Sequence, residues 1–198
     1  MSKAPARLVL ASRSAIRRKL LVDAGLALEV DAADVDERAI GEAIADPAAR
    51  ALCLATDKAL AVGARHPGAV VLGSDQVGVL EDGSFLEKPS DQADHVRMLL
   101  AMSGRSQTFF VAAALVLDSV VRATVQDQVA VTFRRFDEAT ARAYVAAGEG
   151  AWSCGGYEIE HRGAQLIARV DGSLHAVLGL PLFGVLEALR GLAPGLLR

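Results

Sequence analysis

Cysteine and aromatic residues are scarce in this 198-residue sequence, and their scarcity excludes several classes of protein. The two cysteines, Cys53 and Cys154, are too few for a disulfide framework or a zinc motif. One tryptophan and two tyrosines leave few rings that could stack on the bases of a nucleic acid. We therefore expect a reducing, intracellular compartment and no stable nucleic-acid partner.

An excess of positive charge and long apolar runs are also missing. The formal net charge is −3, so no overall basic field attracts nucleic acid, and any recognition of an anion must be local. No apolar run reaches roughly 18 residues, the length of a membrane helix, and none of signal-peptide length precedes Arg13. The four histidines are scattered and form no zinc, Ser-His-Asp or Cys-His arrangement. These features predict a cytoplasmic protein without a membrane anchor.

Hydrophobic residues make up 52% of the chain and charged residues 23%, a globular composition. Apolar runs predict strands at 8–11, 28–30, 69–72, 77–80, 107–117, 120–134 and 166–170. Caps and helical spacing predict helices at 14–24, 48–65, 90–102, 137–148 and 181–190. The acidic segment 31–38 is expected to be irregular. This order favours an α/β fold: a mixed twisted sheet with flanking helices, two lobes around a cleft, and one domain over residues 1–198.

The first candidate site is the polar turn that follows the first predicted strand. Ser12, Arg13 and Ser14 precede the arginine pair Arg17 and Arg18 at the start of a predicted helix. The free backbone N–H groups of a helix N-terminus favour a phosphate, and an arginine one turn along could bind its oxygens in a bidentate fork. The alternative is that Ser14 is an ordinary N-cap and that both arginines are solvated.

The second candidate is Asp75, in the segment Gly73–Gln76 at the expected end of a buried strand. An acid at the carboxyl end of such a strand lies at the rim of an α/β cleft, where ligands bind. There it could coordinate Mg²⁺ or activate a water. The alternative is a surface acid that caps a turn.

Isolated charged residues supply further candidates. Lys88 precedes a proline, Lys58 lies on a predicted helix, and Glu37 ends an acidic loop. For each of them the alternative is simple solvation. In the glycine-rich segment 153–163, the carboxylate of Glu160 could accept hydrogen bonds from a base edge such as that of guanine, unless this segment is only a flexible loop.

Short motifs follow one another in a characteristic order along the chain. They are A-S-x-S-x-x-R, V-D-E, an alanine-rich helix with a lysine, G-S-D-Q, x-K-P, Y-x-I-E and G-L-P-L. From about Leu8 to Leu189 this set resembles the Maf family of nucleoside triphosphate pyrophosphatases. The resemblance implies hydrolysis between the α- and β-phosphates to a monophosphate and pyrophosphate. It also implies a divalent cation, Mg²⁺ or Mn²⁺, and a homodimer.

The same resemblance implies roles for individual residues. Asp75 matches the family's proton acceptor, and Glu37 matches an acid that binds the metal together with Asp75. The phosphate-binding positions are Ser12, Arg17, Lys58 and Lys88. The positions that select the base are Ile16, Gln76 and Glu160.

Two branches of the family differ at these base-selecting positions. Gln76 and Glu160 resemble the branch that acts on 7-methyl-GTP, whereas dTTP/UTP members resemble G-A-D-T and Y-x-I-Q-G. The 7-methyl-GTP branch has a tryptophan where this chain has Ile16, and isoleucine offers no cation–π contact to a methylated base. A purine-type nucleotide or 7-methyl-GTP is therefore favoured, and dTTP or UTP is the alternative. A non-catalytic nucleotide-binding regulator is the alternative from another class.

Overall fold

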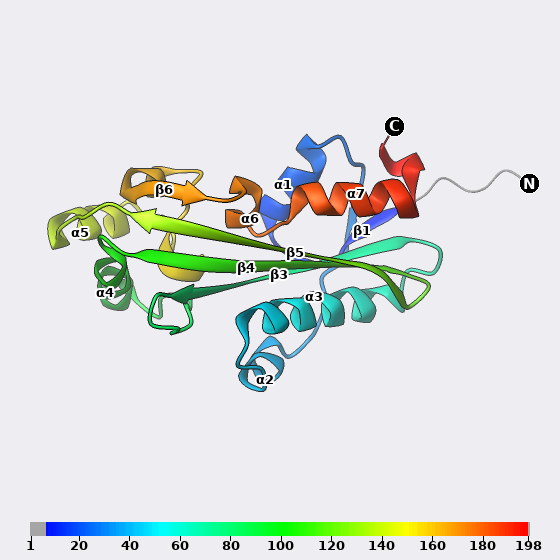
Figure 1. Cartoon of the computed structure of the whole chain (residues 1–198), viewed down its shortest axis with the longest axis horizontal. Helices are drawn as coiled ribbons and strands as arrows, with labels where there is room; N and C mark the ends of the chain where they lie inside the picture. The colour runs from blue at the N-terminus through cyan, green and yellow to red at the C-terminus, as the bar shows by residue number, and fades with distance from the viewer. Residues whose placement is uncertain (1–6, 198) are drawn as a thin grey trace, which may run out of the picture. The chain divides into compact units, whose positions relative to one another are not determined.

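The strands form one six-stranded mixed sheet in the order β2-β1-β3-β4-β5-β6 (Figure 1). The computed structural model describes residues 7–197, apart from the side chains at positions 38, 41 and 42. The strands are β1 (Leu8–Leu10), β2 (Glu29–Val30), β3 (Val70–Leu80), β4 (Ser106–Leu117), β5 (Val120–Phe133) and β6 (Ile167–Asp171). β1 pairs in parallel with β2 and β3, and β6 pairs antiparallel with β5. The predicted α/β fold with a mixed sheet is confirmed.

The helices begin at side-chain caps that the sequence largely predicts. They are α1 (Ala15–Asp23), α2 (Glu37–Glu42), α3 (Pro47–Gly63), α4 (Gln92–Met102), α5 (Glu138–Ala146), α6 (Leu174–Val177) and α7 (Leu182–Leu192), with 3₁₀ turns η1 (Cys154–Gly156), η2 (Arg162–Leu166) and η3 (Pro194–Leu197). Ser14, Asp46 and Asp137 accept the backbone N–H three residues further on. Asp91 caps α4 in the same way, so this helix begins two residues later than predicted.

No helix within residues 7–197 combines the length and the apolar character needed to span a membrane.

The chain divides into two compact units, which are described one at a time. Among the described residues, unit 1 takes those within Met1–Gln76, Phe110–Asp127 and Leu178–Arg198. Unit 2 is Val77–Phe109 with Gln128–Val177. The long strands β3, β4 and β5 contribute residues to both units.

In unit 1 the two faces of the sheet carry different cores because side chains alternate along a strand. Leu8 and Leu10 of β1 face a leucine-rich core that α1 and α7 cover. Val9 faces the other core, where small residues let α3 approach the strands closely. Figure 1 shows α3 on one side of these strands and α7 on the other. The helices of unit 1 thus fix the strands on which the candidate residues lie.

The structure corrects two predicted elements in the first half of the chain. The strands expected at 69–72 and 77–80 are one continuous strand, β3, so Asp75 lies within a strand and not at its end. Gly73 permits this continuity, because a Cβ there would lie 2.1 Å from the carbonyl oxygen of Ala55 in α3. The acidic segment 31–38, expected to be irregular, leads into α2, where Asp36 accepts the N–H of Ala39 at 3.0 Å.

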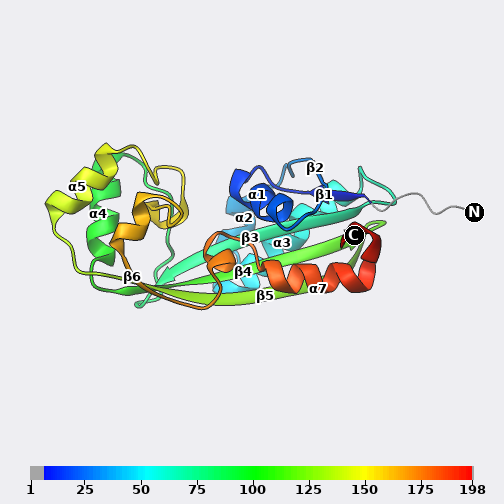
Figure 2. The same ribbon diagram turned by 90° about the horizontal axis from the view of Figure 1, so that it is seen from above.

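In unit 2, α4 and α5 lie side by side, and a glycine-rich segment connects α5 to β6 (Figure 2). The chain turns back at the end of β3 in a hairpin with two backbone hydrogen bonds, Leu80 N–H to Ser84 O at 2.9 Å and Leu86 N–H to Gly78 O at 2.8 Å. The segment Leu86–Lys88 follows directly from this hairpin. The short helix α6 is not among the predicted elements.

Candidate functional site

Arg17 is held by three hydrogen bonds within unit 1. Its Nε donates to the carbonyl of Gly179 at 2.7 Å, and its Nη1 donates to the carbonyl of Ser74 at 3.0 Å and to Ser12 Oγ at 3.3 Å. The guanidinium therefore joins the turn before α1, the strand β3 and the turn before α7. Arg18 is exposed. The alternative that both arginines are solvated is therefore wrong for Arg17.

The two serines of the first turn have different tasks. Ser14 is the N-cap of α1, since its hydroxyl accepts the N–H of Arg17 at 3.3 Å. Ser12 Oγ accepts twice, from Ser14 N–H at 3.2 Å and from Arg17 Nη1 at 3.3 Å. A hydroxyl with both lone pairs occupied still has one proton to donate. Ser12 can therefore donate a hydrogen bond to an anion, and Ser14 is structural.

A lysine lies between two carboxylates in unit 1. Lys58 is 6% exposed and Asp75 is 7% exposed. Lys58 Nζ lies 2.6 Å from Asp75 Oδ1 and 3.0 Å from Oε1 of the exposed Glu37. Burial excludes both a solvated role for Lys58 and a turn-capping role for Asp75. Lys58 contacts Asp75 through Oδ1, and the ammonium group of the lysine has a third proton beyond its contacts with Asp75 and Glu37.

The charges of Arg17, Asp75 and Glu37 act on one another. Burial lowers the pKa of Arg17 from its ordinary value, and the negative charges of Asp75 and Glu37 oppose this shift. A guanidinium stays protonated throughout the physiological range, so Arg17 remains a cation beside the two carboxylates. Positive and negative groups therefore converge around Ser74 and Asp75, as recognition of a metal-bound polyanion requires.

Glu37 and Asp75 fit a magnesium site of the kind that a substrate completes. Both carboxylates contact the same lysine nitrogen, so they face one small region. Residues 7–197 contain no cluster of three or more His, Cys, Asp or Glu residues placed to hold an ion by themselves. Mg²⁺ is usually bound by one or two carboxylates together with substrate phosphates. The residues present match that mode of binding.

Ile16 and Gln76 also belong to unit 1 and are both half-buried. Ile16 lies on the first turn of α1 beside Arg17, and Gln76 follows Asp75 in β3. Two of the three residues expected to select the base are therefore direct sequence neighbours of Arg17 and Asp75.

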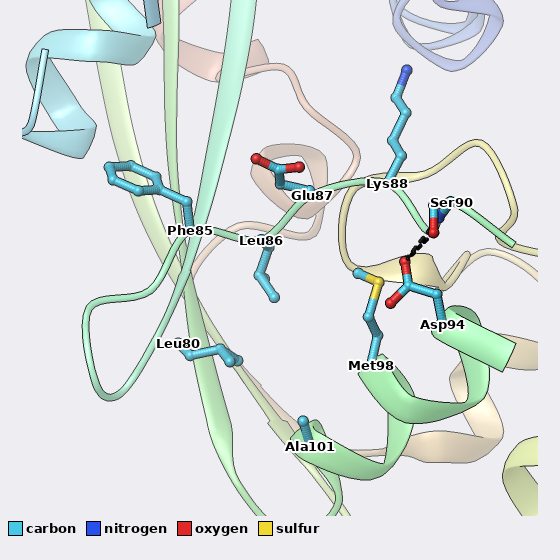
Figure 3. A pocket seen from close by; sticks show the side chains of 9 residues that line it. All are labelled: Leu80, Phe85, Leu86, Glu87, Lys88, Ser90, Asp94, Met98 and Ala101. Atoms are coloured by element: carbon cyan, nitrogen blue, oxygen red, sulfur yellow. Dashed lines mark hydrogen bonds between the residues drawn. The ribbon is translucent and has the colours of Figure 1, made fainter. Parts of the chain in front are cut away.

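Lys88 belongs to unit 2, where it lines a cavity of about 440 Å³ (Figure 3). Leu86 and Met98 point toward each other across the apolar part of this cavity, whereas Lys88 points away from it. Asp94 at the rim accepts the N–H and the hydroxyl of Ser90, both at 2.9 Å. The ammonium group of Lys88 is exposed and directed away from the apolar lining.

The loop that carries Glu160 is fixed at several points within unit 2. Gly155 N–H donates to the carbonyl of Glu87 at 3.0 Å, which joins the loop to the residue before Lys88. Buried His95 hydrogen-bonds the carbonyl of Gly156, and Tyr144 Oη accepts Glu158 N–H at 3.0 Å. Burial raises the pKa of Tyr144 to about 12, so its hydroxyl stays neutral. Glu160 is exposed beyond these anchors.

The sequence analysis did not identify three buried polar side chains that form hydrogen bonds inside the units: Ser74 in unit 1, and Gln107 and Tyr157 in unit 2. Ser74 is fully buried, with its hydroxyl 2.8 Å from the carbonyl of Ala112 and 3.0 Å from that of Gly179. Gln107 donates from Nε2 to Tyr157 Oη in the interior of unit 2. The one sequence signal for the role of Ser74 is the glycine in G-L-P-L. It marks a sharp turn before α7, and its carbonyl is one of the two that the Ser74 hydroxyl contacts.

The fold and this constellation define a class of protein: an α/β protein with hydroxyl, guanidinium and ammonium donors placed beside a buried carboxylate. The model of the Maf-like protein family matches residues 7–192. The chain belongs to the Maf family.

Relatives at about 40% identity carry different substrate names. A 7-methyl-GTP pyrophosphatase from Rhizobium johnstonii is 40% identical over 94% of this chain and 96% of its own length. A dTTP/UTP pyrophosphatase from Deinococcus radiodurans is 39% identical over 93% of this chain and 92% of its own. A nucleoside triphosphate pyrophosphatase from Nitrobacter hamburgensis is 39% identical over 94% of each chain. All three are similar to this chain over nearly its full length.

Proposed function

We propose that this protein is a nucleoside triphosphate pyrophosphatase that hydrolyses its substrate to a monophosphate and pyrophosphate. The arrangement of Ser12, Arg17 and Lys58 around Asp75 carries the proposal. Each of these three donors is held by contacts within the protein and has at least one further N–H or O–H to donate. Membership of the Maf family and the names of the relatives support the same reaction.

Asp75 is the proton acceptor in this proposal. Its Oδ1 is held by Lys58 at 2.6 Å, which leaves Oδ2 to accept a proton from a water. The water oxygen bonds to the α-phosphorus, the bond from this phosphorus to the α–β bridging oxygen breaks, and pyrophosphate leaves with the bridging oxygen. Asp75 takes the proton that the water loses.

Ser12, Arg17, Lys58 and Lys88 bind phosphate oxygens. Hydrogen-bond donors that the protein already holds in place stabilise the negative charge that develops on these oxygens, because the donors need not reorganise during the reaction. Glu37 and Asp75 would hold Mg²⁺ or Mn²⁺, which supplies positive charge to the phosphates when bound.

The nucleobase is selected by Ile16, Gln76 and Glu160. A carboxylate at position 160 accepts hydrogen bonds from the N1–H and N2–H₂ of a guanine edge, which favours a purine-type nucleotide or 7-methyl-GTP. Isoleucine at position 16 offers no aromatic face to a methylated base. Ile16 therefore counts against a methylated base and leaves an unmethylated guanine nucleotide possible. The second candidate is a dTTP/UTP pyrophosphatase, whose phosphate site is the same. We also propose a homodimer in the cytoplasm, on the family resemblance alone.

A panel of nucleotides tests the proposal. Purified protein is incubated with GTP, 7-methyl-GTP, ATP, dTTP or UTP, with Mg²⁺, Mn²⁺ or EDTA, and pyrophosphate release is measured. We expect metal-dependent release, with the highest kcat/KM for a guanine nucleotide. The highest kcat/KM for dTTP or UTP would establish the second candidate. Nucleotide binding without release of pyrophosphate under any condition would overturn catalysis and indicate a binding regulator.

A further inference from the structure

The carbonyl oxygen of Gly179 accepts hydrogen bonds from two other segments of unit 1. Arg17 Nε donates to it at 2.7 Å, and the Ser74 hydroxyl lies 3.0 Å from it. The same Ser74 hydroxyl lies 2.8 Å from the carbonyl of Ala112, so its single proton is shared between two acceptors. The bond from Arg17 is therefore the stronger of the two contacts to Gly179.

Arg17 and Ser74 also contact each other, which closes a ring of three residues. Arg17 Nη1 donates to the carbonyl of Ser74, the residue before Asp75, at 3.0 Å. With the bond to Ser12 Oγ, three of the five guanidinium N–H groups are engaged by the protein. Within residues 7–197, the protein's hydrogen bonds to this guanidinium use Nε and Nη1, and the two N–H groups on Nη2 form none. Arg17 is thus held in one orientation with one nitrogen left for a ligand.

Glycine is required at position 179 for two independent reasons. Its φ of +89° lies in the left-handed region, where side chains other than glycine are strained. A Cβ there would lie 3.2 Å from both Nε and Nη2 of Arg17, closer than an ordinary van der Waals contact. Any other residue would therefore press on the guanidinium, and its strain would move the carbonyl that orients it.

We propose that Gly179 is a positioning residue, whose carbonyl and missing side chain orient Arg17 toward a phosphate oxygen of the substrate. The inference rests on the proposed function, because it takes Arg17 as a ligand of the triphosphate. Gly179 itself touches no reacting atom. Its contribution is to place Nη2 before the substrate arrives, and this placement lowers the cost of ordering a long side chain.

Gly25 offers a matched control for the backbone strain. It follows α1, which carries Arg17, and its φ is +85°, but a Cβ there would meet nothing within 4 Å. Gly179→Ala and Gly25→Ala therefore add the same methyl group at nearly the same φ, and only the first adds it beside Arg17. We expect both variants to lower Tm through the strain of a positive φ, and Gly179→Ala to lower it more, because its methyl group also crowds Arg17. We expect kcat/KM of Gly25→Ala to stay within about twofold of wild type and that of Gly179→Ala to fall by up to about 10²-fold.

A double-mutant cycle shows whether Gly179 acts through Arg17. In an Arg17→Ala background the guanidinium is absent, so Gly179→Ala should lower kcat/KM by less than about threefold further. Losses that multiply in the double variant would overturn the proposal. So would a Gly179→Ala protein as active as Gly25→Ala.

Binding of inorganic tripolyphosphate, measured by calorimetry, separates this proposal from the proposed function. We expect wild type and Gly25→Ala to bind it with the same affinity, and Gly179→Ala and Arg17→Ala to bind it at least about 10-fold more weakly. This pattern in a protein that releases no pyrophosphate would uphold the positioning role and overturn the enzyme. Normal turnover by wild type, together with equal tripolyphosphate binding by Gly179→Ala and Gly25→Ala, would uphold the enzyme and overturn the positioning role.

Discussion

Lys58 Nζ lies 2.6 Å from Asp75 Oδ1, and both side chains are at least nine-tenths buried. The lysine also lies 3.0 Å from Glu37, so one ammonium group is shared by two neighbouring carboxylates. Removing either member of a buried pair leaves the other without compensation, and this costs far more than the pair itself contributes. The two removals are unequal here, because Lys58 keeps Glu37 when Asp75 is lost.

Lys58→Met should therefore destabilise the protein more than Asp75→Asn does. The lysine variant leaves two carboxylates facing each other, and we expect it to lower the free energy of unfolding by about 3–5 kcal/mol. Urea denaturation at neutral pH measures the difference. The control is Lys19→Met, which removes the exposed ion pair between Lys19 and Asp23 and should cost less than about 1 kcal/mol. Equal losses for Lys58→Met and Lys19→Met would contradict the buried charge arrangement.

Glu160→Gln should move substrate preference from guanine toward uracil or thymine. An amide both donates and accepts, whereas the carboxylate only accepts, so the amide suits a pyrimidine edge better. We expect the ratio of kcat/KM for GTP to that for UTP to fall by about 10-fold or more. Glu158→Gln is the matched control, because its carboxylate already accepts the Ser153 hydroxyl at 3.2 Å. An unchanged ratio in Glu160→Gln, or an equal change in both variants, would reject this selector.

The buried pair of Gln107 and Tyr157 should show strong coupling. Gln107 is 1% exposed and its Oε1 is buried without a hydrogen-bond partner in the described chain, so Tyr157 supplies the partner for its Nε2. Tyr157→Phe should cost about 1–3 kcal/mol of unfolding free energy, because it leaves the amide unpaired at both ends. Adding Gln107→Leu should recover part of this loss. A double variant less stable than either single variant would show that the pair is not coupled as described.

Stability should depend on pH through Asp31. Hydrogen bonds from Arg65 at 2.9 and 3.0 Å, and next the contact with His66, lower the pKa of Asp31 from 3.8 to about 2. Because the pKa of the folded state is lower than that of the unfolded state, the contribution is complete above about pH 4 and is lost as the pH falls toward 2. The unfolding free energy of wild type should exceed that of Asp31→Asn at pH 6, and the gap should close near pH 2. A gap that persists unchanged at pH 2 would exclude this pair as its source.

The sequence predicts the regular elements well where local signals decide them. Ser14 and Asp137 start helices by capping, and the strands 107–117 and 120–134 match β4 and β5 within one residue at each end. The prediction of a strand end at Gly73–Asp75 was wrong, because a glycine followed by two polar residues is typical of the end of a strand. There the glycine makes room for α3 and the Ser74 hydroxyl bonds to neighbouring carbonyls, so β3 continues. Such compensation depends on tertiary contacts and leaves no local pattern.

The candidate site was predictable in part. The motifs identify Arg17, Lys58 and Asp75, and the structure brings these three residues into one unit. No local pattern reveals that Arg17 bonds to Gly179, 162 residues away, or that Lys58 bridges two carboxylates. The arginine at the start of α1 opposes the helix dipole, and its bonds to two carbonyls explain how the fold tolerates it there.

Product analysis of wild type and Asp75→Asn tests the central claim most directly. Both proteins are incubated with the preferred nucleotide and Mg²⁺ below the melting temperature of the variant, and the products are followed by ³¹P NMR. The account predicts a monophosphate and pyrophosphate in equal amounts from wild type, and a rate about 10²–10⁴-fold lower for Asp75→Asn. A diphosphate with orthophosphate as products, or near-normal turnover by folded Asp75→Asn, would contradict it.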